Sequence, residues 1–200
     1  MEGIEYFEKY APVVSWSTVR LLMITSITQG WKSRQVDFSN AFVQADLNEQ
    51  VYISLPSGFD GPNGEDRKEV VLKLNKSLYG LVQAPMYWFN YLKTKMEGVG
   101  LMQSELDQCL FYGRGVVALC YVDDCLFWGP DESEIDKIIQ ELKDKGMKLT
   151  QEEGSAYAFL GVDVEPLSSG GFKMTQKGLN KKMLATMGME DCNSKSTPAA

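Results

Sequence analysis

Two apolar runs separated by only two residues restrict the fold of this chain more than any other feature. The runs are residues 116–122 and 125–128, and Asp123 and Asp124 lie between them. β-prone runs this close together predict a tight antiparallel hairpin. The chain is therefore expected to contain a sheet that buries both runs and carries two acids at a hairpin tip.

Hydrophobic periodicity predicts helices and further strands on both sides of this hairpin. We expect helices at residues 17–29, 86–97, 131–145 and 176–187, and a helical turn at 41–45. We expect strands at 34–38, 51–55, 70–74, 158–165 and 172–175, with a loop at 56–69. Ser15 or Ser17 would cap the first helix, Gly30 would end it, and Gly80 and Pro85 would precede the second. This order, without regular βαβ alternation, predicts an α+β fold in which a mixed or antiparallel sheet is backed by helices.

Composition excludes several classes of protein and site. The chain has 200 residues, 44% of them hydrophobic, which is enough for a packed core. No apolar run approaches the roughly 20 residues of a membrane-spanning helix, and no secretory leader is visible, so no membrane partner is expected. The four cysteines lack metal-site spacing and there is no histidine, which argues against zinc sites and histidine triads. We expect a reduced, intracellular protein whose cysteines mostly pack as small apolar residues.

The net charge of −7 argues against a free-standing nucleic-acid binder. The chain has 20 basic and 27 acidic residues. Affinity for a phosphate backbone comes largely from Lys and Arg. Local charge distribution, metal ions or additional chain would have to offset this balance.

The two adjacent acids, Asp123 and Asp124, have two interpretations. Adjacent carboxylates repel one another, and partial burial raises the pKa of one of them unless a cation compensates. Mg²⁺ prefers one or two carboxylates together with water and substrate phosphates. The alternative is an ordinary exposed turn, in which Asp is common, and taken alone this is the favoured interpretation.

Asp37 changes that weighting, because it is another acid near the end of an expected strand. It too has an ordinary interpretation, as the cap of the helical turn that follows. If its strand neighbours the hairpin in one sheet, three carboxylates converge and can hold two metal ions about 3.5 to 4 Å apart. Such a site suits in-line attack of a primer 3′-hydroxyl on a nucleoside triphosphate.

The sequence Tyr121-Val122-Asp123-Asp124 resembles the YxDD signature of reverse transcriptases. Over practically the whole chain, further segments resemble copia-like (Ty1/copia) retrotransposon polymerases in order and spacing. They are KYAPVV (9–14), QVD (35–37), NAF (40–42), VYI (51–53), LPSGF (55–59), KSLYGLVQAP (76–85) with Trp88, FLG (159–161), GM (188–189) and STP (196–198).

The resemblance implies roles for individual residues. Asp37, Asp123 and Asp124 would be catalytic and would bind two Mg²⁺ ions, with Mn²⁺ as an alternative. Phe42 would favour dNTPs by clashing with a 2′-hydroxyl, although an ordinary core phenylalanine is the alternative. The implied nucleotide-binding residues are Phe38, Ala41, Phe42, Tyr79, Gly80 and Gln83. The implied primer and template contacts are Tyr121, Val122, Phe159, Leu160 and Gly161, although the last three also fit a buried strand with a bulge.

The resemblance also implies a domain and its partners. Residues 1–200 would form a reverse transcriptase domain, with a palm-like sheet and incomplete fingers. The family's basic upstream strands and its downstream connection and RNase H would lie outside the chain. The partners would be an RNA or DNA template with its primer, dNTP, and the rest of a Gag-Pol polyprotein, including integrase and RNase H. The location would be cytoplasmic, in a virus-like particle, or nuclear.

Two other functions remain open at this point. In the first, the chain encodes the polymerase residues but is an inactive relic or fragment, which the acidic balance and the missing upstream strands favour for the isolated chain. It also fits another two-metal phosphoryl-transfer enzyme, such as a nuclease. The KSLYGLVQAP segment argues against a nuclease, which has no evident need for this helix entrance.

Overall fold

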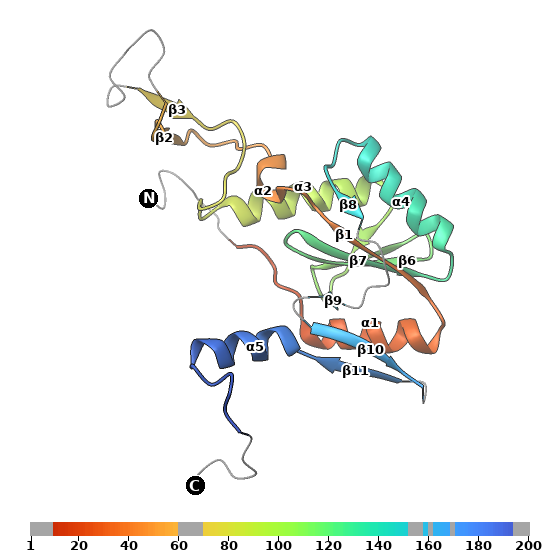
Figure 1. Ribbon diagram of the computed structural model, residues 1–200. Coiled ribbons are helices and arrows are strands. Elements are labelled where there is room, and N and C mark those ends of the chain that lie inside the picture. The colour runs from red at the N-terminus through yellow and green to blue at the C-terminus, as the bar shows by residue number, and fades with distance from the viewer. Residues whose placement is uncertain (1–9, 60–69, 152–157, 160–161, 169–170, 194–200) are drawn as a thin grey trace. The chain divides into compact units, whose positions relative to one another are not determined.

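The computed structural model describes residues 10–59, 70–151, 158–159, 162–168 and 171–193 (Figure 1). The chain divides into two compact units, residues 1–153 and residues 154–200. Each unit is described by itself. Within the described ranges, no helix is both long enough and apolar enough to cross a membrane.

The first unit is built around a six-stranded antiparallel sheet. Its strands follow the order β4-β5-β6-β7-β1-β8, and β2 and β3 form a separate antiparallel pair. The elements are α1 (Trp16–Thr28), β1 (Lys32–Asp37), α2 (Ala41–Gln44), β2 (Tyr52–Ser54), β3 (Val71–Lys73), α3 (Ala84–Gly98), β4 (Met102–Gln103), β5 (Leu110–Gly113), β6 (Val116–Tyr121), β7 (Asp124–Gly129), α4 (Glu132–Asp144) and β8 (Thr150–Gln151). The predicted α+β class and antiparallel sheet are confirmed.

The main core lies between this sheet and two helices. In Figure 1, α3 and α4 lie on one side of the sheet and α1 on the other. Alternate residues of β6 and β7, among them Ala118 and Phe127, pack against Trp88 of α3 and Ile138 of α4. Because successive side chains of a strand point to opposite faces, the residues between them face away from these two helices. Leu119 and Leu126 are in that second set and are also fully buried.

The second unit is a three-stranded antiparallel sheet followed by a helix. The strands lie in the order β11-β10-β9. The elements are β9 (Ala158–Phe159), β10 (Val162–Leu167), β11 (Gly171–Thr175) and α5 (Lys177–Thr186). The single strand expected over residues 158–165 is wrong, because that range contains parts of two strands, β9 and β10, which pair antiparallel.

The helix ends follow the local rules with one correction. Ser15 caps α1, since its side chain accepts a hydrogen bond from the Ser17 backbone N–H, and Gly30 follows the helix with a φ of 64°. Pro85 was expected to precede the next helix but lies within the first turn of α3. Proline is tolerated there because the first N–H groups of a helix have no partner within it.

Three of the four cysteines are buried, as expected. Cys109, Cys120 and Cys125 are in the interior of the first unit, Cys192 is exposed, and none of them forms a disulfide.

Candidate active site

The structure places Asp37 and Asp124 directly opposite each other in the sheet. Strand β1 pairs with β7, and the two acids are partners at the end of this ladder. Asp124 is also the partner of Tyr121 in the β6–β7 hairpin. Val36 and Cys125, one residue away on each strand, face the core beneath α3 and α4. The two aspartates therefore point to the opposite face of the sheet, on the same side as each other.

Asp123 lies in the hairpin loop between the strands, and two hydrogen bonds hold this loop. The backbone N–H of Phe38 donates to the Asp123 carbonyl oxygen at 2.7 Å. The indole Nε1 of Trp88 donates to the Val122 carbonyl oxygen at 2.5 Å. Val122 has a φ of 54°, in the left-handed region that a β-branched residue rarely adopts. These bonds fix the loop against both β1 and α3.

The negative charges of Asp37 and Asp123 lie close enough to affect each other. Burial raises the pKa of the Asp37 carboxyl, and the charge of Asp123 raises it further. Among the described residues, no Lys or Arg forms an ion pair with Asp37 or Asp123. Such an arrangement favours a bound cation, which would stabilise the ionised carboxylates.

The donor chemistry of the site fits Mg²⁺ but not a metal enclosed by protein. In the described part of the chain, no group of three or more Asp, Glu, Cys or His side chains is arranged to hold a metal ion. Mg²⁺ does not require such a group, because it takes one or two carboxylates and keeps water or substrate phosphates as its other ligands. The half-buried Asp37 and its neighbours supply that smaller set.

Two aromatic residues expected at a nucleotide site lie beside the aspartates. The rings of Phe42 and Tyr79 are in contact, with centroids 4.5 Å apart. Burial raises the pKa of the Tyr79 hydroxyl, as do the charges of Asp123 and then Asp37. Tyr79 is therefore within electrostatic reach of both acids, although it lies more than forty residues from each in the sequence.

The other expected nucleotide-binding residues have varied environments. Phe38 and Ala41 are fully buried, and Phe38 packs edge-on against Trp88 with ring centroids 5.4 Å apart. Gly80 is exposed and has a φ of 100°, a conformation that glycine adopts without strain. Gln83 is buried, and its Nε2 donates to Glu49 Oε2 at 3.0 Å.

The expected primer and template contacts divide between the two units. Tyr121 is half-buried and Val122 is exposed, and both belong to the aspartate hairpin of the first unit. Phe159 lies in β9 of the second unit, where only its backbone is described. Leu160 and Gly161 lie outside the described residues.

Sequence reasoning missed one residue that supports the site, Gln44 at the end of α2. Its Nε2 donates to the carbonyl oxygens of Ser39 and Lys148, both at 2.8 Å, and its Oε1 accepts from the Lys148 N–H at 2.8 Å. This buried amide ties the segment after Asp37 to the chain entering β8. The amino-acid sequence around Gln44 contains no pattern that predicts this role. The hydrogen bond from the Trp88 indole to the hairpin was also missed.

A comparison with protein families identifies the chain. The family model described as reverse transcriptase (RNA-dependent DNA polymerase) matches residues 1–200. The chain belongs to this family.

Individual relatives of this reverse transcriptase domain are parts of retrotransposon polyproteins. It is 32% identical to the retrovirus-related Pol polyprotein from transposon RE2 of Arabidopsis thaliana, over 99% of this chain and 14% of that protein. It is 31% identical to the corresponding polyprotein from transposon TNT 1-94 of Nicotiana tabacum, over 100% of this chain and 15% of that protein. The yeast transposon Ty1-H Gag-Pol polyprotein is 29% identical over 70% of this chain and 8% of its own length.

These relatives confirm the predicted resemblance to copia-like retrotransposons: the chain is a reverse transcriptase domain of copia-type Pol. It spans only about a seventh of the length of the plant polyproteins that it matches.

Proposed function

We propose that this domain catalyses two-metal nucleotidyl transfer from a dNTP to a primer 3′-hydroxyl. The observation that carries the proposal is the pairing of Asp37 with Asp124 at the end of the β1–β7 ladder, beside Asp123 in the hairpin loop. Asp37 and Asp123 are the proposed metal ligands, and Asp124 is a ligand or a close electrostatic neighbour. All three aspartates are half-buried, so each keeps part of its surface open to solvent.

Two Mg²⁺ ions, or Mn²⁺ in their place, would activate the attacking oxygen and stabilise the leaving oxygen. The chain's own contribution is to hold the carboxylates in place before substrate binds. The hydrogen bonds from Phe38 and Trp88 to the hairpin do this, because they attach the loop to β1 and to a rigid helix. The raised pKa of Asp37 means that its ionised form is disfavoured, and a bound metal ion would stabilise that form.

The residues around the aspartates suit a nucleotide pocket. Phe42, supported by its ring contact with Tyr79, is proposed to exclude the 2′-hydroxyl of ribonucleotides. Gly80 and Gln83 would line the same pocket, with Phe38 and Ala41 supporting its floor from the core. Replacing Phe42 by Ala should then allow rNTP incorporation while leaving dNTP incorporation measurable.

The remaining assignments follow the family. The six-stranded sheet would be the palm, and the β2–β3 pair would belong to the fingers. Tyr121 and Val122 would contact the primer or template, together with Phe159, Leu160 and Gly161 of the second unit. Because one relative is named a Gag-Pol polyprotein, we propose that the domain works beside integrase and RNase H, in a cytoplasmic virus-like particle or in the nucleus.

The test measures metal binding and catalysis separately. Mg²⁺ or Mn²⁺ binding to the chain is followed by calorimetry, and primer extension is followed on poly(rA)/oligo(dT) with dTTP. Asp123→Asn is expected to weaken metal binding and to abolish extension. Asp144→Asn is the matched control, because Asp144 is an exposed acid at the end of α4 whose only described contact is with Gln140.

The outcomes separate the site from the activity. Metal binding that depends on Asp123, with no extension, would support the site and identify this chain as an inactive fragment or relic. Extension that persists in Asp123→Asn would contradict the proposed roles. Unchanged metal binding in all three proteins would contradict the metal site itself.

A further inference from the structure

Two buried cysteines face each other across the same hairpin that carries Asp123 and Asp124. Cys120 of β6 and Cys125 of β7 are direct cross-strand partners, and their Sγ atoms are 2.8 Å apart. Both side chains are almost completely buried. Catalysis as proposed above uses neither thiol.

The position of this pair in the ladder suits a disulfide. The Cys120 N–H donates to the Cys109 carbonyl oxygen at 2.9 Å, on the side away from β7, so Cys120 and Cys125 form a non-hydrogen-bonded pair. Cα atoms in such pairs lie about 4.5 Å apart, at the short end of the roughly 4.4 to 6.8 Å range that disulfides span.

A solvent-open pocket beside the hairpin reaches the cysteine pair at Cys120. Its lining includes Cys120 together with Trp88 and Val122 of the hairpin region. Cys120 therefore lies at the pocket wall, whereas Cys125 is not among the lining residues and lies behind it.

We propose that Cys120 and Cys125 are a reversible thiol–disulfide site, oxidised by small aliphatic disulfides. The Cys120 sulfur attacks one sulfur of the reagent RSSR, forming a mixed disulfide and releasing RS⁻. The Cys125 sulfur, after losing its proton, then attacks the Cys120 sulfur and expels the second RS⁻. The two cysteines are oxidised and RSSR is reduced to two RSH, which take up the two thiol protons. A dithiol of the same class reverses the reaction.

The product would join β6 to β7 next to the aspartates. Cys120 and Cys125 are each within a few residues of Asp123, so the bond would restrict the motion of the loop that holds this carboxylate. The thiol site itself does not depend on the proposed polymerase function. Only the consequence for catalysis does.

A third buried thiol, Cys109, is the competing partner. Burial raises the pKa of both the Cys109 and the Cys125 thiols, so acidity does not distinguish them as partners of Cys120. The two differ in position. The Cys109 carbonyl oxygen accepts the Cys120 N–H, whereas Cys125 is the cross-strand partner of Cys120 in β7. The identity of the linked cysteines therefore tests the geometry.

The test uses the full chain carrying Cys192→Ala, which removes the exposed thiol. The folded protein is incubated with 2-hydroxyethyl disulfide, quenched with acid, and its free thiols are counted. We expect the count to fall from three to one and to return to three with dithiothreitol. Digestion at aspartate residues cleaves between Cys120 and Cys125 but leaves Cys109 and Cys120 on one peptide. In the chain that also carries Cys109→Ala, mass spectrometry without reduction should therefore find two peptides joined only by this disulfide. Hydrogen exchange of residues 121–125 should slow in the oxidised protein.

Controls distinguish this site from incidental oxidation. Adding Cys109→Ala should leave the cross-link intact, whereas adding Cys125→Ala should eliminate it. A linkage that includes Cys109 would overturn the proposal. So would three free thiols in the folded protein after an incubation that oxidises the same chain in denaturant, because the pair would then be reactive only on unfolding.

Discussion

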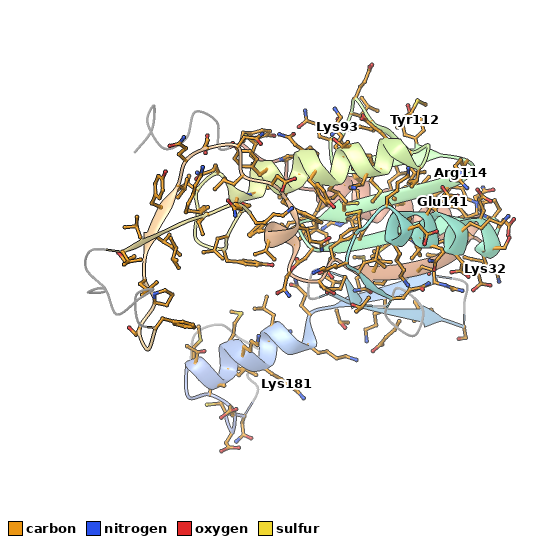
Figure 2. All side chains as sticks on the ribbon, turned by 90° about the horizontal axis from the view of Figure 1, so that it is seen from above. Lys32, Lys93, Tyr112, Arg114, Glu141 and Lys181 are labelled. Carbon is orange, nitrogen blue, oxygen red and sulfur yellow. The ribbon has the colours of Figure 1, made fainter. Side chains whose placement is uncertain are left out.

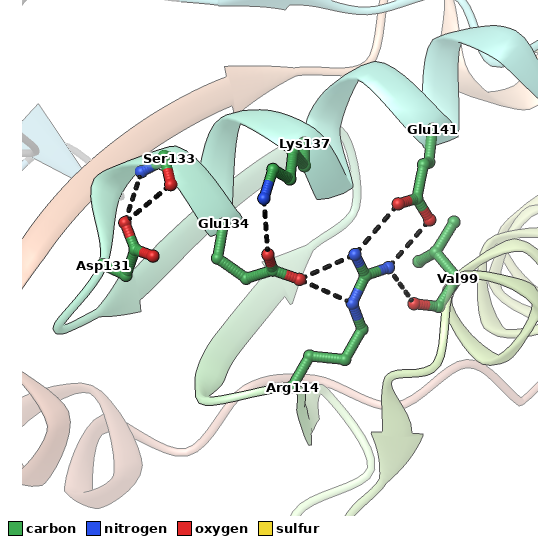
Figure 3. A network of polar contacts seen from close by, with 7 residues as sticks. All are labelled: Val99, Arg114, Asp131, Ser133, Glu134, Lys137 and Glu141. Atoms are coloured by element: carbon green, nitrogen blue, oxygen red, sulfur yellow. Dashed lines mark hydrogen bonds and ion pairs between the residues drawn. The ribbon is translucent and has the colours of Figure 1, made fainter.

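Charged side chains near the two ends of strand β6 have opposite environments. At its beginning, Arg114 donates to Glu141 through Nη1 and Nη2, at 2.7 and 2.9 Å, and through Nε to Glu134 at 2.8 Å. Its Nη1 also donates to the Val99 carbonyl oxygen at 2.9 Å (Figure 3). Figure 2 shows Arg114 and Glu141 next to each other at this end of the sheet. At the other end, Asp37 and Asp123 have no such partner among the described residues.

The difference indicates which end is structural and which is functional. Arg114 pairs with both Glu134 and Glu141 and offsets their mutual repulsion, and the pKa of Glu141 is lowered mainly by its hydrogen bond to Arg114. Burial and the charge of Asp123 instead raise the pKa of Asp37. A protein retains like charges without compensation mainly where a ligand will supply it. The same substitution, acid to amide, should therefore have opposite effects at the two ends.

The largest expected effect is on catalysis. Asp123→Asn should lower the rate of primer extension by about 10²- to 10³-fold, since losing a metal ligand costs several kcal/mol of transition-state stabilisation. It should not lower the free energy of unfolding, because it removes a charge that repels Asp37. Glu141→Gln should do the reverse, leaving extension intact and destabilising the fold. Parallel measurements of extension and urea unfolding check both, and a large loss of stability in Asp123→Asn would contradict the comparison.

The next largest effect concerns Arg114. Arg114→Ala should lower the free energy of unfolding by about 1 to 2 kcal/mol, a value reduced from that of buried charged hydrogen bonds because these side chains are partly exposed. Arg114→Lys keeps the charge but cannot bind Glu141 through two nitrogens, so its loss should be intermediate. Urea unfolding measures both variants. Equal stability of Arg114→Ala and the parent chain would show that the network contributes nothing.

A smaller effect is expected for the bond that holds the aspartate loop. Trp88→Phe keeps an aromatic ring in the core but removes the donor to the Val122 carbonyl oxygen, which should cost about 1 kcal/mol. The hairpin should also exchange its amide hydrogens faster at residues 121–124. Trp128→Phe is a control on the same sheet, because Trp128 has no described hydrogen bond to this loop. Equal exchange in both variants would show that the indole does not position the hairpin.

The strongest sequence signals predicted the parts of the structure on which the site depends. The hairpin around Asp123, the strand that ends at Asp37 and the amphipathic helix before Lys145 are all found within one or two residues of their expected positions. Each of these has a local cause, such as apolar periodicity or a turn. The helix α4 begins one residue after its expected start, and Asp131, the expected first residue, caps it by accepting a hydrogen bond from the Ser133 N–H at 2.9 Å.

The missed features depend on contacts between distant residues. Strands β4 and β8 have two residues each and β5 has four, too short for an alternating pattern to show. Asp37 and Asp124 are paired in the sheet although they lie nearly ninety positions apart in the sequence. The sequence alone therefore predicted their convergence only if the two strands were neighbours. Gln44 and Arg114 look like ordinary surface residues in the sequence, and their partners lie on other elements.

The smallest expected effect is a pair of opposite pH dependences. Below the ordinary Asp pKa of 3.8, Asp37 is protonated whether the chain is folded or not. As the pH rises through 3.8 and then through the raised folded pKa, the unfolded chain releases this proton first. The folded state thus holds more protons, and Asp37 lowers the free energy of unfolding as the pH rises.

Glu141 should have the opposite slope, because its folded pKa is lowered: its contribution is present above its ordinary pKa of 4.5 and is lost as the pH falls through the folded value. Urea unfolding between about pH 3 and pH 7 should show a shallower decline with rising pH in Asp37→Asn and a shallower loss with falling pH in Glu141→Gln. Added Mg²⁺ should reduce the pH dependence that Asp37 causes and leave that of Glu141 unchanged. A bound cation would favour the ionised carboxylate of Asp37, whereas Arg114 already favours that of Glu141. Equal responses of the two variants to Mg²⁺ would remove the distinction between the two ends of β6.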